Sequence, residues 1–213
     1  KQGWINLYKP KNITSFKAIN FIKKNFLIKK IGHAGTLDPM AEGILPIAIG
    51  KATKLIPYIN IMKKEYEFTI TWGSQTTTDD SQGKILFESN YFPTKNEIEN
   101  KINNYLGYIN QIPPKVSAVK INGKRAYKLF RENVTFTIEP KKVFVENLSI
   151  IKHSTDKTSF KISCGKGFYV RSFARDFALD LKTYGHISSL KRSKVGKFTE
   201  KTSILLDDLL KIG

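Results

Sequence analysis

The sequence predicts an α+β fold in which a mixed, largely antiparallel central sheet is flanked by helices. Residues 66–72 alternate strictly between apolar and polar side chains, as a half-buried strand does. Residues 169–185 instead repeat their apolar side chains at helical spacing. Segments of the two kinds are mixed along the chain without a regular strand–helix–strand alternation, which favours an antiparallel sheet.

The first half of the chain supplies one helix, two strands and an unusual loop. Thr14 and Ser15 can cap a helix whose apolar residues Ile19, Ile22 and Phe26 share one face. Residues 31–50 are apolar, rich in Gly and Pro and nearly uncharged, so we expect a buried loop there. After the strand at 66–72 come a polar loop and a returning strand at 84–89.

The second half supplies further helices and strands. Thr94 and Glu97 form a capping-box pattern that begins a helix running up to Gly107. Asn122-Gly123 predicts a tight hairpin, followed by a helical turn at 126–132. Residues 141–150 and 158–164 are typical of strands, residues 169–185 of a helix, and residues 203–211 of a short last helix. One continuous domain over residues 1–213 is the simplest organisation.

The charge of the chain is strongly unbalanced. Lys and Arg number 36 against 18 Asp and Glu, which gives a formal net charge of +18. A basic domain attracts polyanions, and nucleic acid is the commonest such partner. Binding to a membrane surface, or a Lys-rich composition without functional meaning, would be the alternatives.

Several classes of protein are disfavoured by composition. The single cysteine, Cys164, excludes an internal disulfide framework and a multi-cysteine zinc site. The three histidines are too scattered for a metal cluster, so we expect no metal. Residues 1–12 resemble no secretory signal, and no apolar run reaches the length of a membrane span. We expect a cytoplasmic protein, with import into an organelle left open.

Asp38 is the most notable candidate for chemistry. It lies between Leu37 and Pro39 in the nearly uncharged loop, where a carboxylate is poorly solvated unless a distant group pairs with it. Arg171 and Arg175, four residues apart on one face of the predicted helix, could provide that partner. Considered alone, Asp38 could equally cap the turn that follows it, and Arg175 has the pattern of an ordinary surface cation.

Other candidates have plainer alternatives. Tyr66 shares a face with Phe68 and Trp72, which favours core packing, although a pocket for an extruded base would want an aromatic side chain there. His33 could bond locally or contact a base, and Cys164 is expected in the core. The basic segments 124–132 and 190–198 suit contacts with phosphates.

Residues 32–46, GHAGTLDPMAEGILP, resemble the catalytic motif of the TruB family of tRNA pseudouridine synthases almost position for position. Four further segments resemble family blocks in the family's order: KPKNITS, YEFTITWGSQTTTDDSQG, PPKVSAVKINGKRAY and CGKGFYVRSFARD. The resemblance extends from residue 3 to about residue 198. Val116 and Phe168 depart from the usual residues, which affects the expected pocket wall.

The resemblance implies roles for eight residues. Asp38 matches the catalytic aspartate, Arg171 the arginine that pairs with it, and Tyr66 the tyrosine that stacks on the target base. Residues expected to contact the substrate are His33, Asp80, Tyr169, Leu190 and Lys9. The implied reaction isomerises uridine 55 in the T loop of tRNA by base flipping, without a cofactor, and Asp38 would act as a nucleophile or as a base at the sugar.

The resemblance also frames the partners and the alternatives. The expected partner is the T stem-loop of tRNA, and we expect the protein to act as a monomer. Many relatives continue into a C-terminal PUA-type domain, which this sequence is expected to lack. A tRNA-binding folding helper with little or no catalysis is the alternative function.

Overall fold

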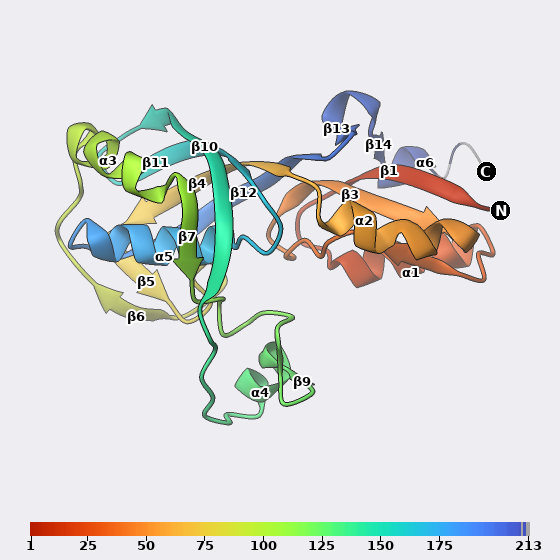
Figure 1. Cartoon of the computed structure of the whole chain (residues 1–213), viewed down its shortest axis with the longest axis horizontal. Helices are drawn as coiled ribbons and strands as arrows, with labels where there is room; N and C mark the ends of the chain where they lie inside the picture. The colour runs from red at the N-terminus through yellow and green to blue at the C-terminus, as the bar shows by residue number, and fades with distance from the viewer. Residues whose placement is uncertain (210, 212–213) are drawn as a thin grey trace. The chain divides into compact units, whose positions relative to one another are not determined.

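The computed structural model describes residues 1–209 and 211 and divides into two compact units (Figure 1). Unit 1 comprises residues 1–67, 163–166 and 189–213, and unit 2 comprises residues 68–162 and 167–188. No helix in the described part of the chain is long and apolar enough to span a membrane.

Unit 1 is built around the strands of the N-terminal third. Its elements are β1 (Gly3–Lys9), α1 (Ser15–Asn25), β2 (Ile31–His33), β3 (Glu42–Ile49), the 3-10 helix η1 (Gly50–Leu55), α2 (Ile56–Asn60), β13 (Phe198–Thr199), η3 (Glu200–Thr202), β14 (Ile204–Leu205) and α6 (Leu206–Leu209). The strand order is β14-β1-β3-β12, where β12 is Gly185–Val195. Strand β3 is antiparallel to β1 and β2 and parallel to β12.

Helix α1 closes the core of unit 1. The Thr14 side chain accepts a hydrogen bond from the backbone N–H of Lys17 and so caps the helix. The apolar face of α1 packs on β1 and β3 (Figure 1), in a buried cluster that contains Leu7, Ala18, Ile19, Ile22, Ile28, Leu45, Ile47 and Ile49. This packing fixes β3, the strand into which the nearly uncharged loop leads.

Unit 2 contains a sheet and its covering helix. Its elements are β5 (Ser74–Thr76), β6 (Ile85–Glu88), α3 (Lys95–Ile102), η2 (Asn103–Tyr105), β7 (Gly107–Gln111), β8 (Lys120–Ile121), β9 (Lys124–Arg125), α4 (Ala126–Arg131), β10 (Lys141–His153) and α5 (Val170–Asp180). Strands β4 (Lys64–Trp72), β11 (Lys157–Cys164) and β12 contribute residues to both units. The strand order is β12-β4-β11-β10-β7.

Aromatic packing holds α5 on this sheet. Phe173 on the helix stacks on Phe177 with ring centroids 5.0 Å apart, and its edge meets the ring of Phe68 on β4 at 5.7 Å. Phe160 on β11 stacks on Phe68 at 5.4 Å. Buried aromatic pairs in these geometries stabilise a core by more than the burial of their apolar surface alone. These contacts therefore hold the first turn of α5 against the sheet.

The structure confirms the α+β class and most predicted elements. The strand at 66–72, the capping box at Thr94, the hairpin at Asn122-Gly123 and the helix after Tyr169 are all present. The helix that begins after Thr94 ends at Ile102, earlier than predicted, because the chain tightens into η2.

Three predictions were wrong in part. Only residues 34–41 of the predicted loop are irregular, because residues 42–49 form the buried strand β3. Strand β6 pairs with β5 and does not return along β4. The last helix, α6, begins only at Leu206, after the short strand β14, and residue 210 of the predicted helix lies outside the described residues. Strands β1 and β12 were not anticipated.

Candidate active site

Asp38 lies in the loop between β2 and β3, and hydrogen bonds hold its neighbours. The Ser15 hydroxyl, in the first turn of α1, donates to the Leu37 carbonyl at 3.0 Å and accepts from the Leu37 N–H at 2.9 Å. The backbone N–H of Asn12 donates to the Pro39 carbonyl at 2.7 Å. The residues on both sides of Asp38 are therefore tied to the segment that leads into α1.

The turn after Asp38 is closed by the main chain. The Ala41 N–H donates to the Asp38 carbonyl at 3.1 Å, and β3 begins at the next residue. No helix begins here, so the partly buried Asp38 side chain does not cap one. The loop that carries Asp38 therefore passes through one turn directly into a strand.

Three cations are buried in unit 1. Lys9, Lys64 and Arg192 have relative exposures of 0%, 8% and 1%. A buried charge is costly unless it is paired or hydrogen-bonded. Each of these three donates to backbone carbonyls.

The two lysines serve different turns. Lys9 donates to the carbonyls of Pro10 and Ile13 at 2.8 Å. Lys64 donates to the carbonyls of Asn60 and Met62 at 2.8 and 2.9 Å. Lys9 therefore organises the turn ahead of α1, and Lys64 the turn that leads into β4.

Burial shifts the pKa values of these groups. It lowers the pKa of Lys9 to about 8, against the opposing effect of the negative charge of Asp38. Burial also lowers the pKa of Lys64 to about 8, with Arg192 acting in the same direction. The electrostatic effect of Asp38 on Lys9 places the carboxylate near a positive charge.

Tyr66 lies near the same charges. It is buried in β4, and burial raises its pKa to about 12, while Arg192 acts in the opposite direction both by its charge and by a hydrogen bond. Asp38 also raises the pKa of Tyr66. Unit 1 thus brings together Asp38, Tyr66 and Lys9 of the predicted site.

His33 and Leu190 are the other predicted site residues of unit 1. His33 ends β2, and burial together with the charge of Arg192 lowers its pKa, which favours the neutral imidazole. A neutral imidazole can both donate and accept a hydrogen bond. Leu190 is a buried residue of β12, two positions before Arg192.

Unit 2 holds Arg171 in the first turn of α5. It is 5% exposed and donates to the carbonyls of Thr78 and Val116, both at 3.0 Å. Its Nε lies 3.9 Å from the Asp80 carboxylate. These contacts fix the direction of the guanidinium within unit 2, and its pairing with Asp38 stays a prediction.

Asp80 lies close to Arg171 in space, and Tyr169 precedes Arg171 by two residues in the sequence. Asp80 accepts hydrogen bonds from the Thr78 hydroxyl at 2.6 Å and the Gln82 N–H at 3.0 Å, so its carboxylate shapes its own buried loop. Tyr169 is the N-cap of α5, and its N–H and carbonyl bond the side chain of Gln111 at 3.0 and 3.2 Å.

The interpretation of Arg175 as an ordinary surface cation was wrong. Its side chain is 17% exposed, pairs with Asp79 at 3.3 Å and Asp176 at 2.8 Å, and donates to the Ile112 carbonyl at 2.9 Å. Helical spacing placed Arg171 and Arg175 on one face correctly, but it could not show that the loop at Asp79 covers that face. Cys164 is buried, as predicted, and burial raises its pKa to about 12.

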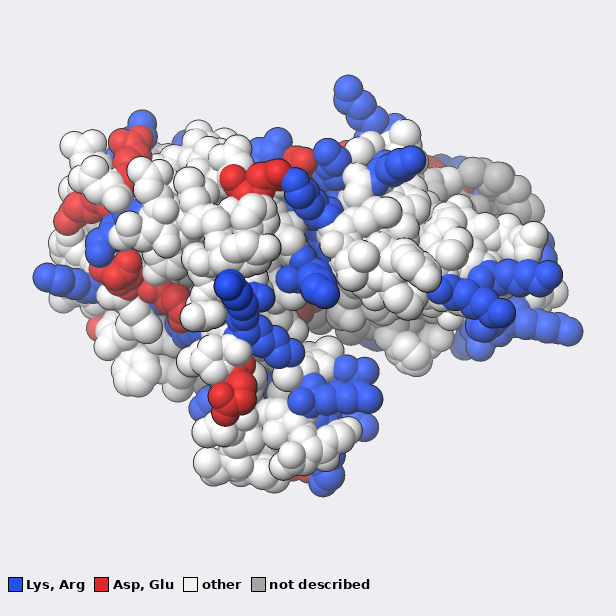
Figure 2. All heavy atoms as spheres, in the orientation of Figure 1, with Lys and Arg blue, Asp and Glu red and all other residues white. Residues whose placement is uncertain are grey.

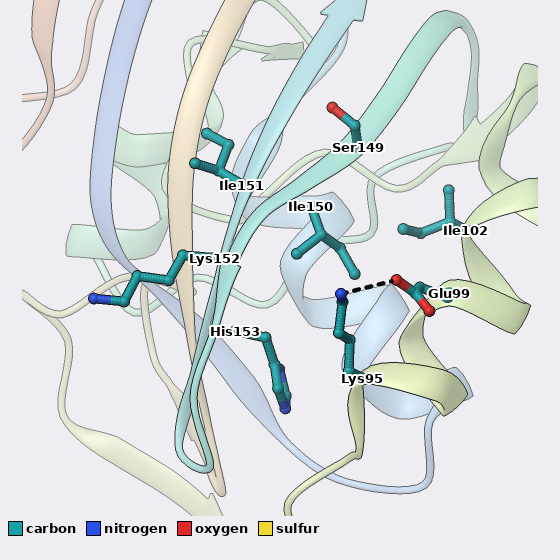
Figure 3. A pocket seen from close by; sticks show the side chains of 8 residues that line it. All are labelled: Lys95, Glu99, Ile102, Ser149, Ile150, Ile151, Lys152 and His153. Carbon is teal, nitrogen blue, oxygen red and sulfur yellow. Dashed lines mark ion pairs between the residues drawn. The ribbon is translucent and has the colours of Figure 1, made fainter.

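A separate pocket in unit 2 contains none of the predicted site residues. It measures about 510 Å³ and lies between α3 and the end of β10 (Figure 3), lined by Lys95, Glu99, Ile102 and residues 149–153. Two of its charged residues, Lys95 and Glu99, pair with each other at 3.5 Å. Within the described part of the chain, no three His, Cys, Asp or Glu side chains lie close enough together to hold a metal ion.

Solved structures define the class of protein. The structure described as "Crystal Structure of a Cbf5-Nop10-Gar1 Complex" matches with a TM-score of 0.77 and 28% identity, over 98% of this chain and 54% of that chain. "Structure of H/ACA RNP bound to a substrate RNA containing 2'-deoxyuridine" matches with a TM-score of 0.74 and 25% identity, over 98% of this chain and 52% of that chain. The fold is that of the pseudouridine synthases.

The family follows from sequence. The model of the TruB family pseudouridylate synthase (N terminal domain) matches residues 23–170, and the chain belongs to this family. The chain is 48% identical to tRNA pseudouridine synthase B of Wolbachia pipientis over 211 residues. The aligned region covers 98% of this chain and 60% of that protein. The chain is 46% identical over 209 residues to tRNA pseudouridine synthase B of Ehrlichia chaffeensis, over 97% and 71% of the two chains.

Proposed function

We propose that this protein isomerises uridine 55 in the T loop of tRNA to pseudouridine, with Asp38 as the catalytic carboxylate. The observation that carries the proposal is the match of nearly the whole chain to relatives named tRNA pseudouridine synthase B. The chain spans only 60 to 71% of those relatives, so their activity and substrate are transferred here as a proposal. The family match includes residues of both units, and we propose that they form a single catalytic domain.

The reaction rearranges one nucleoside. The bond from uracil N1 to ribose C1′ breaks, the base turns, and C5 bonds to C1′; the proton at C5 leaves and N1 regains one. The atoms balance within the substrate and water. The protein must expose the base, hold it while it is detached, and supply a group that acts at the nucleoside.

Exposing the base costs free energy. Extrusion of a nucleotide costs about a few kcal/mol in lost stacking and pairing. We propose that stacking on Tyr66 offsets part of that cost, as aromatic side chains do for splayed RNA bases. His33, Tyr169 and Leu190 would contact the loop or the base. The buried bonding of Lys9 and Asp80 supports an indirect role, in which each holds a loop near the substrate.

Phosphate contacts would supply much of the affinity. Residues 115–131 carry six basic residues and no acidic one, and all six are exposed. Figure 2 shows Lys and Arg gathered near β9. The Arg131 guanidinium lies over the Tyr127 ring, 5.7 Å from its centroid. Exposed cations interleaved with an aromatic side chain suit an RNA backbone and its bases.

The charge of Asp38 is central to the proposed chemistry. We propose that Arg171 keeps this carboxylate ionised and oriented, because a guanidinium donates in a fixed, bidentate geometry that an ammonium lacks. The relatives are bacterial and named for tRNA, which supports action in the cytoplasm. Action as a monomer stays a prediction, which sedimentation analysis would test.

The test is pseudouridine mapping on an unmodified tRNA transcript incubated with the purified protein, beside Asp38→Asn. We expect modification at the T-loop uridine with the wild type only. Asp38→Asn should still bind tRNA, because the amide has nearly the same shape and the RNA-binding surface is unchanged. Substantial turnover by Asp38→Asn would contradict the assigned role. A wild type that binds tRNA without modifying it would support the folding-helper alternative.

A further inference from the structure

Arg192 links the two ends of the loop that carries Asp38. From β12, its Nη2 donates to the Gly35 carbonyl at 2.9 Å and its Nε donates to the Ile44 carbonyl at 2.8 Å. Nη1 also reaches the Thr36 carbonyl at 3.5 Å. Because Gly35 and Ile44 lie before and after Asp38, one guanidinium fixes the width of the loop at its base.

The loop is built around this side chain. Gly35 has φ +86°, and a Cβ there would lie 3.3 Å from Nη1 of Arg192. Gly43 has φ +113°, and a Cβ there would lie 2.3 Å from the Arg192 carbonyl oxygen. Glycine at both positions therefore lets the main chain and the guanidinium of Arg192 approach the loop closely.

Arg192 also acts on Tyr66. Arg192 lowers the pKa of Tyr66, against the larger raising effect of burial. In the described part of the chain, Arg192 forms no ion pair with a carboxylate. No acid in that part of the chain neutralises the charge of this buried arginine. Its contribution to the structure therefore lies in the directional hydrogen bonds that it donates to carbonyls.

We propose that Arg192 is a positioning residue that fixes the Asp38 loop in one arrangement. The proposal deepens the proposed function and rests on it. Arg192 need not touch the RNA, because its bonds end on the protein. The sequence-based interpretation of residues 190–198 as phosphate contacts is therefore wrong for Arg192, which is buried.

The test compares Arg192→Lys with Lys64→Met. The ammonium of lysine keeps the positive charge, but it lacks the planar guanidinium geometry with which Arg192 bonds three carbonyls. We expect Arg192→Lys to lower the single-turnover rate at saturating enzyme about 100-fold, the effect of a small misplacement of reacting groups. RNA affinity should be unchanged. Lys64→Met removes another buried cation, which bonds carbonyls outside the loop, so it should destabilise the protein while keeping the wild-type rate.

Hydrogen exchange on the RNA-free proteins gives a readout that does not depend on activity. We expect faster exchange at the amides of residues 34–41 in Arg192→Lys than in the wild type, and no such change in Lys64→Met. If wild-type protein proves inactive on tRNA, the proposed function fails, whereas the exchange result still decides whether Arg192 holds the loop.

Two outcomes would overturn the positioning role. One is a wild-type rate in Arg192→Lys, and the other is an equal loss of rate in Lys64→Met. If Arg192→Lys does not fold, Gly35→Ala replaces it, because the added methyl group would lie 3.3 Å from the guanidinium and crowd it while the charge remains. Gly35→Ala should show the same loss of rate and the same faster exchange in the loop, and the absence of both would reject the proposal.

Discussion

Gly43 has a steric role that its position in a regular strand conceals. It pairs with Arg192 in the parallel register of β3 and β12, and the backbone of Arg192 occupies the place of a side chain at Gly43. The nitrogen and carbonyl carbon of Arg192 would both lie 2.9 Å from a Cβ at Gly43. Any larger residue must therefore separate two paired strands of unit 1.

We predict that Gly43→Ala lowers the free energy of unfolding by at least about 2 kcal/mol. Backbone strain at positive φ costs about 1–3 kcal/mol, and the clash with β12 adds an overpacking cost. Urea denaturation measures the loss. The matched control is Gly123→Ala, since Gly123 also has positive φ but has no atom within 4 Å of a built Cβ. Equal costs at the two positions would show that the approach of β12 is unimportant.

Lys64 makes the stability of unit 1 dependent on pH. Burial lowers its pKa to about 8 from an ordinary value near 10.5. Between these two values the unfolded chain holds a proton that the folded chain has released, so folding becomes more favourable as the pH rises through this window. This contribution of Lys64 to the free energy of unfolding is fully present above pH 10.5 and is lost as the pH falls through about 8.

We predict that the free energy of unfolding of the wild type rises relative to that of Lys64→Met between pH 7.5 and pH 10. Urea denaturation at a series of pH values gives the difference, in which titrations common to both proteins cancel. Lys9 has a similar pKa and remains in both proteins, so the comparison isolates Lys64. Parallel pH profiles would mean that the Lys64 pKa is not lowered in the folded protein.

At the scale of elements, the sequence predicts the helices and strands in which apolar side chains recur at a regular spacing. Helix α5 and strand β4 each present one apolar face, so their periods of 3.6 and 2 are visible. Strand β3 is buried along nearly its whole length and contains Gly43 and Pro46, so its residues predict a loop. Burial on both faces removes the alternation that identifies a strand.

Strand β12 was not predicted from the sequence for a different reason. Lys191, Arg192 and Lys194 dominate its second half, and a sequence pattern treats every one of them as exposed. In the structure Arg192 points into unit 1, while Lys191 pairs with Glu67 at 2.9 Å and Glu200 at 3.2 Å. The same arginine was missed as a site residue, because its partners are main-chain carbonyls, which leave no trace in the sequence.

Asp38 was found because its loop contrasts with the rest of the chain. Asp38 and Glu42 are the two acids of residues 31–50, a segment without Lys or Arg in a basic protein, and the resemblance to the family motif proposes a role for Asp38. The support for that loop comes from Ser15, Asn12 and Arg192, which are distant in sequence. The candidate carboxylate was therefore visible from local residues, whereas the contacts that hold its loop in place required the fold.

At the scale of the whole molecule, the excess of positive charge supports binding to RNA and predicts strong dependence on salt. The formal net charge is +18, and cations that contact phosphates release condensed counterions. The charge is not spread evenly, because residues 115–131 hold six exposed cations and no acid, and of these cations Lys124 pairs with the following Glu132 at 4.0 Å. Other exposed lysines, such as Lys95 and Lys157, already pair with Glu99 and Asp156.

We predict that the double variant Lys120→Gln, Lys128→Gln weakens tRNA binding and lowers the slope of log affinity against log salt by about 2, or roughly 1 for each phosphate that is no longer neutralised. Filter binding across a salt series measures both quantities. The control is Lys95→Gln with Lys157→Gln, which removes the same formal charge from exposed positions that pair with carboxylates. If net charge alone drives binding, the two double variants will weaken it equally. A larger change in slope for Lys120→Gln, Lys128→Gln would locate phosphate contacts on the segment of residues 115–131.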